Sequence, residues 1–330
     1  MGSGKGLCII PVFLSYMGCP RRCLFCSQKG ITENDSERTF DELDQRVETY
    51  VTSRTAHSGT FGPTPGKIEI AFYGSTFTSI SEASQEAYLR WALGWVETGY
   101  VQSIRVSTRP DELSEEKISR LARYGVKTIE IGVQSFDENT LRQNRRYYTS
   151  AEIAHAFALL RTEPFQLGIH LMTHMYGSSR GLDEQSLAAA LSYRPDFLRV
   201  HPTLVIRQTG LEDLYLRGLY RPASLFETVD QCSDWLLICQ QAGTPVVRMG
   251  LHIPVDRVTE VLAGPYHPSF GDLVYKMASL KQRLAAERHH ESEEEEMEKE
   301  HREALGSYKG FFTDWYSEQH RLILNSKAQR

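Results

Sequence analysis

Apolar residues gather along this chain in short runs of strand length, separated by longer stretches of mixed character. The first run, residues 7–14, is almost continuously apolar and is followed by a polar loop. A run of this kind is typical of a parallel strand that is buried on both faces. We expect strands over residues 7–14, 68–73, 104–107, 128–133, 166–171 and 197–201, and a seventh over 245–251.

Helical patterns alternate with these runs. They cover residues 40–51, 82–97, 114–123, 150–162, 183–192 and 224–242. Alternation of strand and helix favours a parallel sheet with crossover helices. The predicted fold class is therefore α/β, as a partial (β/α)6 TIM-like barrel whose sheet the seventh strand extends.

The chain divides by composition into two parts, residues 1–255 for the barrel with its sheet extension and 256–330 for a largely helical C-terminal extension. Residues 287–303 carry nine glutamates and three basic residues with few apolar anchors. This composition predicts a solvated helix or a disordered linker. The aromatic-rich residues 308–316 are expected to pack on the barrel or on a partner.

Length and charge narrow the class of protein further. A chain of 330 residues with 41% hydrophobic content can bury one large core. Six residues before the first strand are too few for a signal peptide, and there is no apolar run of 18 residues. We expect a cytoplasmic protein with no membrane partner. The net charge is −5, of which residues 287–303 contribute −6, so the remainder is about +1 and has no broad basic footprint for nucleic acid.

The loop after the first strand holds the most specific motif. Cys19, Cys23 and Cys26 set three thiols at a C-x3-C-x2-C spacing. A four-iron cluster usually takes four cysteines, so three would leave one iron open to a substrate or cofactor. A zinc knuckle is the alternative, but its fourth ligand would have to be His57 or a later residue, which is poor zinc spacing. Cys8 lies within the strand and is expected to belong to the core.

This spacing, with Phe25 before the last cysteine, resembles the signature of the radical S-adenosylmethionine (SAM) superfamily. The resemblance implies a [4Fe–4S] cluster on Cys19, Cys23 and Cys26, with SAM on the fourth iron. It also implies reductive cleavage of SAM to methionine and a 5′-deoxyadenosyl radical. The electron would come from a reductant such as ferredoxin or flavodoxin.

Polar and small residues follow the next strands, where sites form in parallel sheets. Gly74, Ser75 and Thr76 resemble the superfamily's glycine-rich segment, which meets the amino group of SAM. The usual second glycine is Ser75 here, and its Cβ restricts positive φ. The sequences Ser-Thr-Arg-Pro-Asp at 107–111 and Gly-Val-Gln-Ser at 132–135 are close to segments of the Elongator catalytic-subunit family.

By this resemblance Ser107, Arg109 and Gln134 are cofactor-binding candidates, with Ser107 and Gln134 bonding the ribose or carboxylate of SAM. Arg146 would be the carboxylate-binding arginine, with Arg145 as the alternative. Segments at 201–210 and 262–271 are similar to the same branch, so the resemblance covers residues 8–275. No stretch after residue 270 has the length of that family's acetyltransferase domain.

The end of the fifth strand departs from the family. Residues 170–178 read His-Leu-Met-Thr-His-Met-Tyr-Gly-Ser where His-Leu-Met-Pro-Gly-Leu-Pro-Gly-Asp is usual. The loop is expected to be remodelled, with His174 and Tyr176 facing the substrate. Other candidates for substrate contact are His201, Arg207, His252, Tyr266 and His267. For each of these His and Tyr residues, the alternative to substrate contact is a purely structural role.

Two hypotheses follow. The first is a radical SAM enzyme acting on an unidentified substrate, whether a small molecule, a peptide or tRNA. RNA is suggested by the family resemblance alone. The second is a non-catalytic metal-binding scaffold, in which the acidic and aromatic C-terminal tail grips a partner protein.

Overall fold

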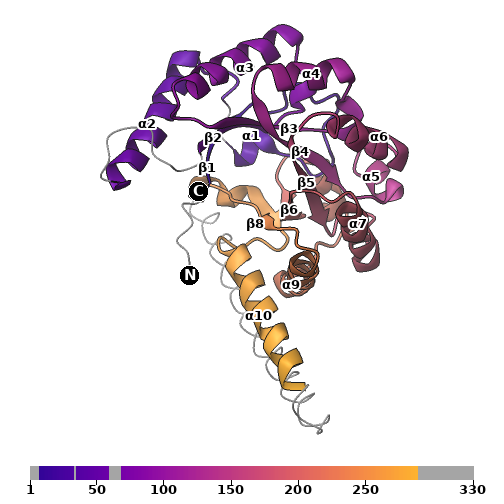
Figure 1. Ribbon diagram of the computed structural model, residues 1–330. Helices are drawn as coiled ribbons and strands as arrows, with labels where there is room; N and C mark the ends of the chain where they lie inside the picture. Colours follow the sequence, from indigo (N-terminus) through magenta and orange to yellow (C-terminus); the bar gives the residue numbers. More distant parts are fainter. Residues whose placement is uncertain (1–6, 33–34, 59–67, 289–330) are drawn as a thin grey trace, which may run out of the picture.

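The computed structural model describes residues 7–32, 35–58 and 68–288. Its centre is a seven-stranded parallel sheet in the order β1-β2-β3-β4-β5-β6-β8, which curls into an open half-barrel (Figure 1). Neighbours in the sheet follow chain order, as is common for consecutive parallel strands joined by crossover helices. The strands are β1 (Cys8–Phe13), β2 (Ile68–Tyr73), β3 (Ser103–Thr108), β4 (Val126–Gln134), β5 (Gln166–Thr173), β6 (Phe197–Pro202) and β8 (Val246–Met249). The predicted α/β partial barrel is confirmed.

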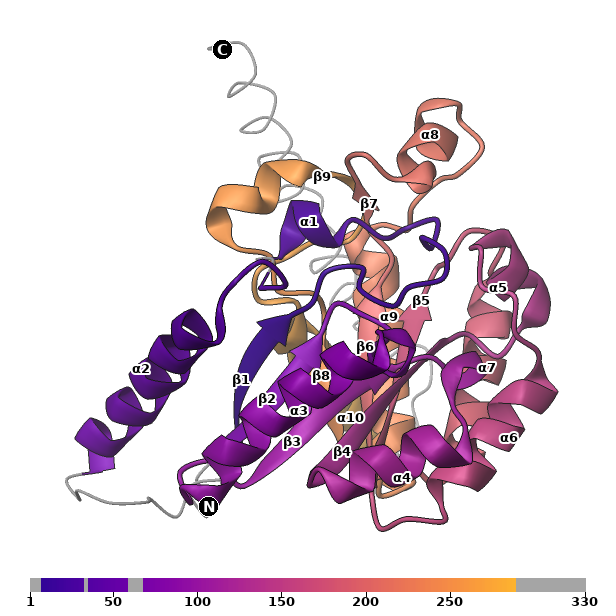
Figure 2. The same ribbon diagram turned by 90° about the horizontal axis from the view of Figure 1, so that it is seen from above.

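Helices cover the outer face of this sheet (Figure 2). They include every helix that the sequence pattern predicts, namely α2 (Phe40–Ser58), α3 (Glu82–Glu97), α4 (Glu115–Arg123), α6 (Ser150–Leu160), α7 (Arg180–Ser192) and α9 (Leu225–Gln241). Serine or threonine caps begin most of them. Thr149 and Ser224 form full capping boxes with Glu152 and Glu227, which satisfies free backbone donors at the starts of α6 and α9.

Short elements that the sequence pattern does not predict gather at the carboxyl edge of the sheet (Figure 2). Among them, β7 (Val205–Ile206) pairs antiparallel with β9 (Val261–Ala263). The others are the helices α1 (Gln28–Ile31), α5 (Glu138–Gln143) and α8 (Gly210–Leu216), and the 3-10 turns η1 (Phe77–Ser79), η2 (Pro110–Glu112) and η3 (Val255–Glu260). Elements of two to seven residues are too short to show a hydrophobic period.

Strand side chains alternate between two different environments. The outward-facing residues are apolar and pack under the helices, as Phe72 does in its stacking with Phe77 at 5.0 Å between ring centroids. Many inward-facing residues are polar, among them the buried Glu69, Arg105 and Glu130, although apolar Phe13 and Met172 also face the interior. Because successive side chains of a strand point to opposite faces, each strand serves the core and the barrel interior together.

Buried charges inside the half-barrel are paired. Arg105 donates to Glu69 from Nε at 2.8 Å and to Glu130 from Nη1 at 2.7 Å. Arg199 donates to the second oxygen of Glu130 at 3.0 Å. Buried ions are tolerated only when such partners compensate their lost hydration. The network therefore ties β2, β3, β4 and β6 together across the interior.

The described chain ends in α10 (Phe270–Arg288), which packs on α9. Lys281 joins the two helices through Asp230 at 2.7 Å and Asp234 at 2.6 Å. The predicted acidic segment, apart from its first two positions, and the aromatic residues 308–316 lie outside the described residues. None of the helices within residues 7–32, 35–58 and 68–288 is long and apolar enough to cross a membrane.

Candidate active site

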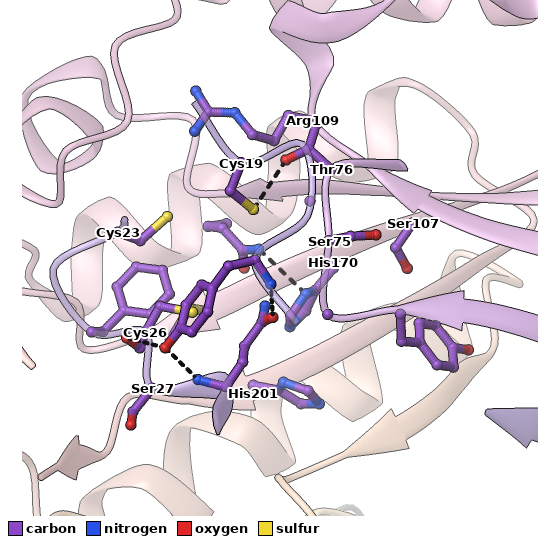
Figure 3. Close-up of a pocket in the computed structure, with 18 of the residues that line it drawn as sticks. Cys19, Cys23, Cys26, Ser27, Ser75, Thr76, Ser107, Arg109, His170 and His201 are labelled. Atoms are coloured by element: carbon purple, nitrogen blue, oxygen red, sulfur yellow. Dashed lines mark hydrogen bonds between the residues drawn. The ribbon is translucent and has the colours of Figure 1, made fainter. Parts of the chain in front are cut away.

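A cavity of about 250 Å³ opens at the carboxyl edge of the sheet, between the loop after β1 and the ends of the other strands (Figure 3). Many of the predicted site residues line it together. They are Cys19, Cys23, Cys26, Gly74, Ser75, Thr76, Ser107, Arg109, Gln134, Arg146 and His201. Residues up to 182 positions apart in sequence thus share one cavity, as parallel strands that end at one edge allow.

The cysteine loop is closed by a reciprocal pair, Tyr16 and Gln28. The Tyr16 backbone N–H donates to Gln28 Oε1 at 3.1 Å, and the Gln28 backbone N–H donates to the Tyr16 hydroxyl at 2.8 Å. The same hydroxyl donates to the carbonyl of Cys26 at 3.4 Å. These bonds hold the beginning and the end of the loop next to each other, so the three thiols are carried on a fixed turn.

Gly18 lets this loop lie directly on the segment after β2. Its φ is +66°, and a Cβ would come within 2.5 Å of the backbone of Thr76 and Ile80. Any other residue would therefore push the loop away from the sheet. The Thr76 backbone N–H donates to the Met17 carbonyl at 3.1 Å, which secures the contact.

The three thiols influence one another. Burial, followed by the neighbouring Cys23 and Cys19, raises the pKa of the Cys26 thiol. Burial and Cys23 raise the pKa of Cys19, although a contact of 3.5 Å with the Thr76 hydroxyl opposes the shift. Thiolates this close repel each other, so a cationic centre that binds all three would stabilise their charged form.

Within the described residues, no three His, Cys, Asp or Glu side chains converge to hold a single metal ion. A mononuclear site brings all of its ligands to one ion. A cubane cluster is different, since each thiolate binds its own iron. The finding therefore applies to mononuclear centres, and the cysteines stay predicted ligands of a cluster.

Arg146, and not Arg145, lies on the cavity. Arg146 is 4% exposed and donates from Nη1 to the Cys23 sulfur at 3.1 Å and from Nε to the Tyr148 hydroxyl at 2.7 Å. A third bond reaches the Gly132 carbonyl. Arg145 is exposed and has a φ of +61°. Of the two arginines, Arg146 is therefore the one that lies in the cavity, and its binding of a carboxylate stays a prediction.

The substituted glycine-rich segment keeps its turn. Gly74 takes the positive φ, +75°, whereas Ser75 is not among the residues with positive φ. The serine Cβ therefore costs no backbone strain. The Ser75 hydroxyl is buried, lines the cavity and has no hydrogen-bond partner among the described residues.

Two more strand-end residues present polar atoms without partners. Arg109 is paired with Asp111 through Nε at 2.8 Å, but its Nη1 is buried and unpaired. Gln134 has a φ of +69° beside a register shift between β4 and β5, and its Oε1 is also buried and unpaired. A buried polar atom without a partner costs about 1–3 kcal/mol, so these atoms favour a polar ligand in the cavity.

Several predicted contact residues lie elsewhere. His174, Tyr176, Arg207, His252, Tyr266 and His267 are not among the residues that line the cavity. The backbone of His174 is bonded to residues outside the cavity. Its backbone N–H donates to the Asp183 carboxylate at 2.8 Å, and its carbonyl accepts from the Tyr220 hydroxyl at 2.8 Å. Tyr176 packs edge-on against Tyr220. The remodelled loop after β5 therefore turns toward α7 and α8 instead of the cavity.

The structure adds cavity residues that the motif search missed. They are Tyr73, Glu130, His170 and Arg199, which come from β2, β4, β5 and β6. Each occupies an inward-facing position of a strand whose alternate residues are apolar. The alternation of polar and apolar residues within these strands was the signal that could have found them.

Comparisons with known proteins agree with this architecture. The radical SAM superfamily profile matches residues 14–181, and the radical SAM C-terminal domain profile matches residues 195–279. Elongator complex protein 3 of Mus musculus is 28% identical over 237 residues, which cover 65% of this chain and 42% of that protein. The tRNA uridine(34) acetyltransferase of Methanocaldococcus infernus is 24% identical over 311 residues, covering 84% and 57%.

Among solved structures, the archaeal Methanocaldococcus infernus Elp3 with an N-terminal deletion superposes with a TM-score of 0.63 at 20% identity, covering 84% of this chain and 63% of that one. The fold is thus shared with that archaeal protein. The chain belongs to the radical SAM superfamily and is an enzyme of that superfamily. Membership implies a [4Fe–4S] cluster and SAM. The chain spans about half the length of the relatives it matches.

Proposed function

We propose that Cys19, Cys23 and Cys26 hold the [4Fe–4S] cluster and that SAM occupies the adjoining strand ends. The observation that carries the proposal is the shared cavity, in which the three thiols adjoin buried polar atoms without partners. A reduced cluster bound there would supply the electron for reductive cleavage of SAM, and so the radical chemistry that the family resemblance implies.

The residues present suit SAM, which carries an amino group, a carboxylate and ribose hydroxyls. Ser75 Oγ and Gln134 Oε1 can accept hydrogen bonds from its donors, and Arg109 Nη1 can donate to its oxygens. Ser107 adds a hydroxyl on the same wall. Gly74 keeps the backbone open to close approach, because it has no Cβ.

Arg146 stabilises the charge of the thiolates in this proposal. Its bond to Cys23 places a positive charge beside the thiolates, and its bonds to Tyr148 and Gly132 fix its position. The Tyr148 hydroxyl also donates to the Val133 carbonyl at 2.6 Å, so the guanidinium rests on β4. A buried arginine held this way stabilises ligand charge without rearranging.

For the substrate, we propose tRNA as the first class to test, because relatives include a protein named for uridine 34 of tRNA. A reductant such as ferredoxin or flavodoxin would complete the system. Gel-shift titrations at several salt concentrations test RNA binding, since phosphate contacts make affinity fall steeply with salt. Binding that is absent at low salt would direct the search to small molecules and peptides.

The cluster is tested by anaerobic reconstitution followed by incubation with SAM and dithionite. We expect a brown protein whose electron paramagnetic resonance signal changes when SAM is added, and which forms 5′-deoxyadenosine. Substituting Cys19, Cys23 or Cys26 by alanine should abolish both properties. Cys8→Ala is the matched control, because Cys8 lies on β1 outside the residues that line the cavity.

Two outcomes would reject the proposal. One is a triple alanine variant that keeps its cluster and its turnover. The other is a colourless protein that takes up zinc and ignores SAM, which would favour the metal-binding scaffold.

A further inference from the structure

Part of the cavity is lined by side chains that have no role in the proposed cluster and SAM sites. Glu130, His170, Arg199 and His201 form its wall, with Tyr73 beside them. All of them face inward from β2, β4, β5 and β6, and His170 and His201 are labelled in Figure 3. An organic substrate of the same cavity would meet these residues.

The hydrogen bonds of His201 fix its tautomer. Arg199 Nε lies 3.3 Å from His201 Nε2. A guanidinium nitrogen can only donate, so His201 Nε2 must accept, and the ring proton resides on Nδ1. Arg199 is itself held by Glu130 at 3.0 Å. His201 is therefore an uncharged imidazole with one N–H to offer.

His170 is fixed in the opposite tautomer. The side-chain amide nitrogen of Gln134 lies 3.3 Å from His170 Nδ1, which makes that nitrogen the acceptor. The proton then resides on Nε2, which is buried and has no partner among the described residues. Burial, reinforced by Arg199, lowers the pKa of His170 to about 3, which is consistent with a neutral ring.

The two imidazoles are in contact. Their centroids are 4.4 Å apart and their planes are inclined by 76°. They come from β5 and β6, which are neighbours in the sheet. The cavity thus has two uncharged N–H donors on adjacent rings, one of them without a partner.

Nothing in this wall offers a free anion to a cationic substrate. The Glu130 carboxylate already accepts from Arg105, Arg199 and the Tyr73 hydroxyl. Arg199 is also opposite Arg248 in the register of β6 and β8. Arg248 is exposed and does not line the cavity, but together with Arg199 it adds positive charge near this wall, which disfavours ammonium groups.

We propose that His170 and His201 bind carbonyl-type oxygens of the substrate through Nε2–H and Nδ1–H, and so select neutral or anionic carbonyl compounds over amines. This inference rests on the proposed function, since it concerns the substrate of the same cavity. Gln134 would link the two parts of the cavity, because its amide nitrogen orients His170 while its oxygen remains for SAM.

The first test is nuclear magnetic resonance of the full chain labelled with 15N-histidine, with and without the reconstituted cluster. We expect His170 protonated on Nε2 and His201 on Nδ1 at neutral pH. Three probes of similar size are then added at equal concentrations: propionamide, propionate and propylammonium. Propionamide and propionate should shift both ring signals, and propylammonium should shift neither. The inference would be overturned if both histidines had the same tautomer, or if propylammonium shifted their signals as much as propionamide does.

Substitutions make the test specific. His170→Leu and His201→Leu remove the N–H, whereas His170→Gln and His201→Asn keep an N–H at the equivalent atom. Loss of one neutral hydrogen bond should weaken propionamide binding roughly fivefold in the leucine variants, and the amide variants should stay within about twofold. If leucine and amide variants weaken binding equally, the donors have no specific role. Because the amide variants are polar and similar in shape, they keep the test valid if the leucine variants fold poorly.

Failure of this inference can be distinguished from failure of the proposed function. SAM cleavage without substrate, measured on the wild-type protein, reports on the cluster and SAM sites. A protein that cleaves SAM but whose histidines respond equally to all three probes rejects the substrate class alone. A protein that cleaves no SAM, yet shows the expected histidine shifts, rejects the proposed function alone.

Discussion

Arg146 donates a hydrogen bond from Nη1 to the sulfur of Cys23 over 3.1 Å, although the two residues are 123 positions apart in sequence. This contact joins the segment after β4 to the loop after β1. It places the buried guanidinium against a proposed cluster ligand. Because Arg146 also donates to the Gly132 carbonyl, it links the thiol loop to β4.

Arg146→Met should therefore lower both stability and cluster content. The substitution leaves the Gly132 carbonyl and the Tyr148 hydroxyl without their charged partner. We expect a loss of about 1–3 kcal/mol in the free energy of unfolding, from buried polar groups left unsatisfied. Iron content after anaerobic reconstitution should fall as well. Arg145→Met is the control, because that exposed side chain should change stability by no more than about 0.5 kcal/mol. Equal effects of the two substitutions would contradict the assignment.

Glu130→Gln tests the charge network inside the half-barrel. Burial alone would raise the pKa of Glu130, but Arg199 and Arg105 lower it, so the carboxylate is ionised and compensates two cations. Neutralising it leaves two buried guanidiniums short of a partner, and we expect a loss of about 3–5 kcal/mol by urea unfolding. Glu184→Gln, in a half-exposed pair with Arg180, should cost less than about 1 kcal/mol. A Glu130→Gln variant as stable as the Glu184→Gln control would show that the network contributes little.

Stability should also depend on pH through His174 and Asp183, which are in contact outside the cavity. Burial lowers the pKa of His174 from 6.5 to about 4, so below pH 6.5 the unfolded chain binds the extra proton and stability falls as the pH drops toward 4. Burial raises the pKa of Asp183 from 3.8 to about 6, so its contribution is full below pH 3.8 and is lost as the pH rises through 6.

These two contributions oppose each other between pH 4 and 6, and substitution should separate them. Asparagine at position 174 suits the φ of +57° there. His174→Asn removes the uptake of at most one proton on unfolding, so the slope of stability against pH should fall by at most about 1.4 kcal/mol per pH unit. Asp183→Asn should make the loss steeper. Urea unfolding between pH 4 and 7 measures both slopes. Identical slopes in the wild type and the two variants would refute this account.

The sequence predicted the parts of the fold that have a local signal. Apolar runs located the seven strands, and the spacing of Cys19, Cys23 and Cys26 located the loop that forms one side of the cavity. The strand-end candidates Ser107 and Gln134 share that cavity because parallel strands end at a common edge, and Arg146 reaches it from the segment after α5.

Features set by distant contacts were not predictable in the same way. The expectation that His174 and Tyr176 face the substrate depended on a loop whose direction is fixed by Tyr220, a residue more than 40 positions later. His170 and Arg199 are polar positions in otherwise apolar strands, which marks them as candidates for the interior, but this pattern does not show which residues they meet there. Pairing their inward positions with Glu130 requires the sheet order, which the structure supplies.

Gly74 and Gly99 offer a matched pair for testing the proposed SAM-binding turn. Both have positive φ, +75° and +79°. Alanine should therefore cost each about 1–2 kcal/mol of stability, from left-handed backbone. At Gly99 a Cβ meets no atom within 4 Å, whereas at Gly74 it would lie 3.0 Å from Gln28 Oε1, which accepts from the Tyr16 backbone.

Only Gly74→Ala should therefore disturb the cavity, because moving Gln28 loosens the pair that closes the cysteine loop. We expect both alanine variants to unfold at similarly reduced urea concentrations. Equilibrium dialysis of the reconstituted proteins should show weaker SAM binding in Gly74→Ala and unchanged binding in Gly99→Ala. Unchanged SAM affinity in both variants would mean that the turn at Gly74 is a structural feature of the strand end with no part in SAM binding.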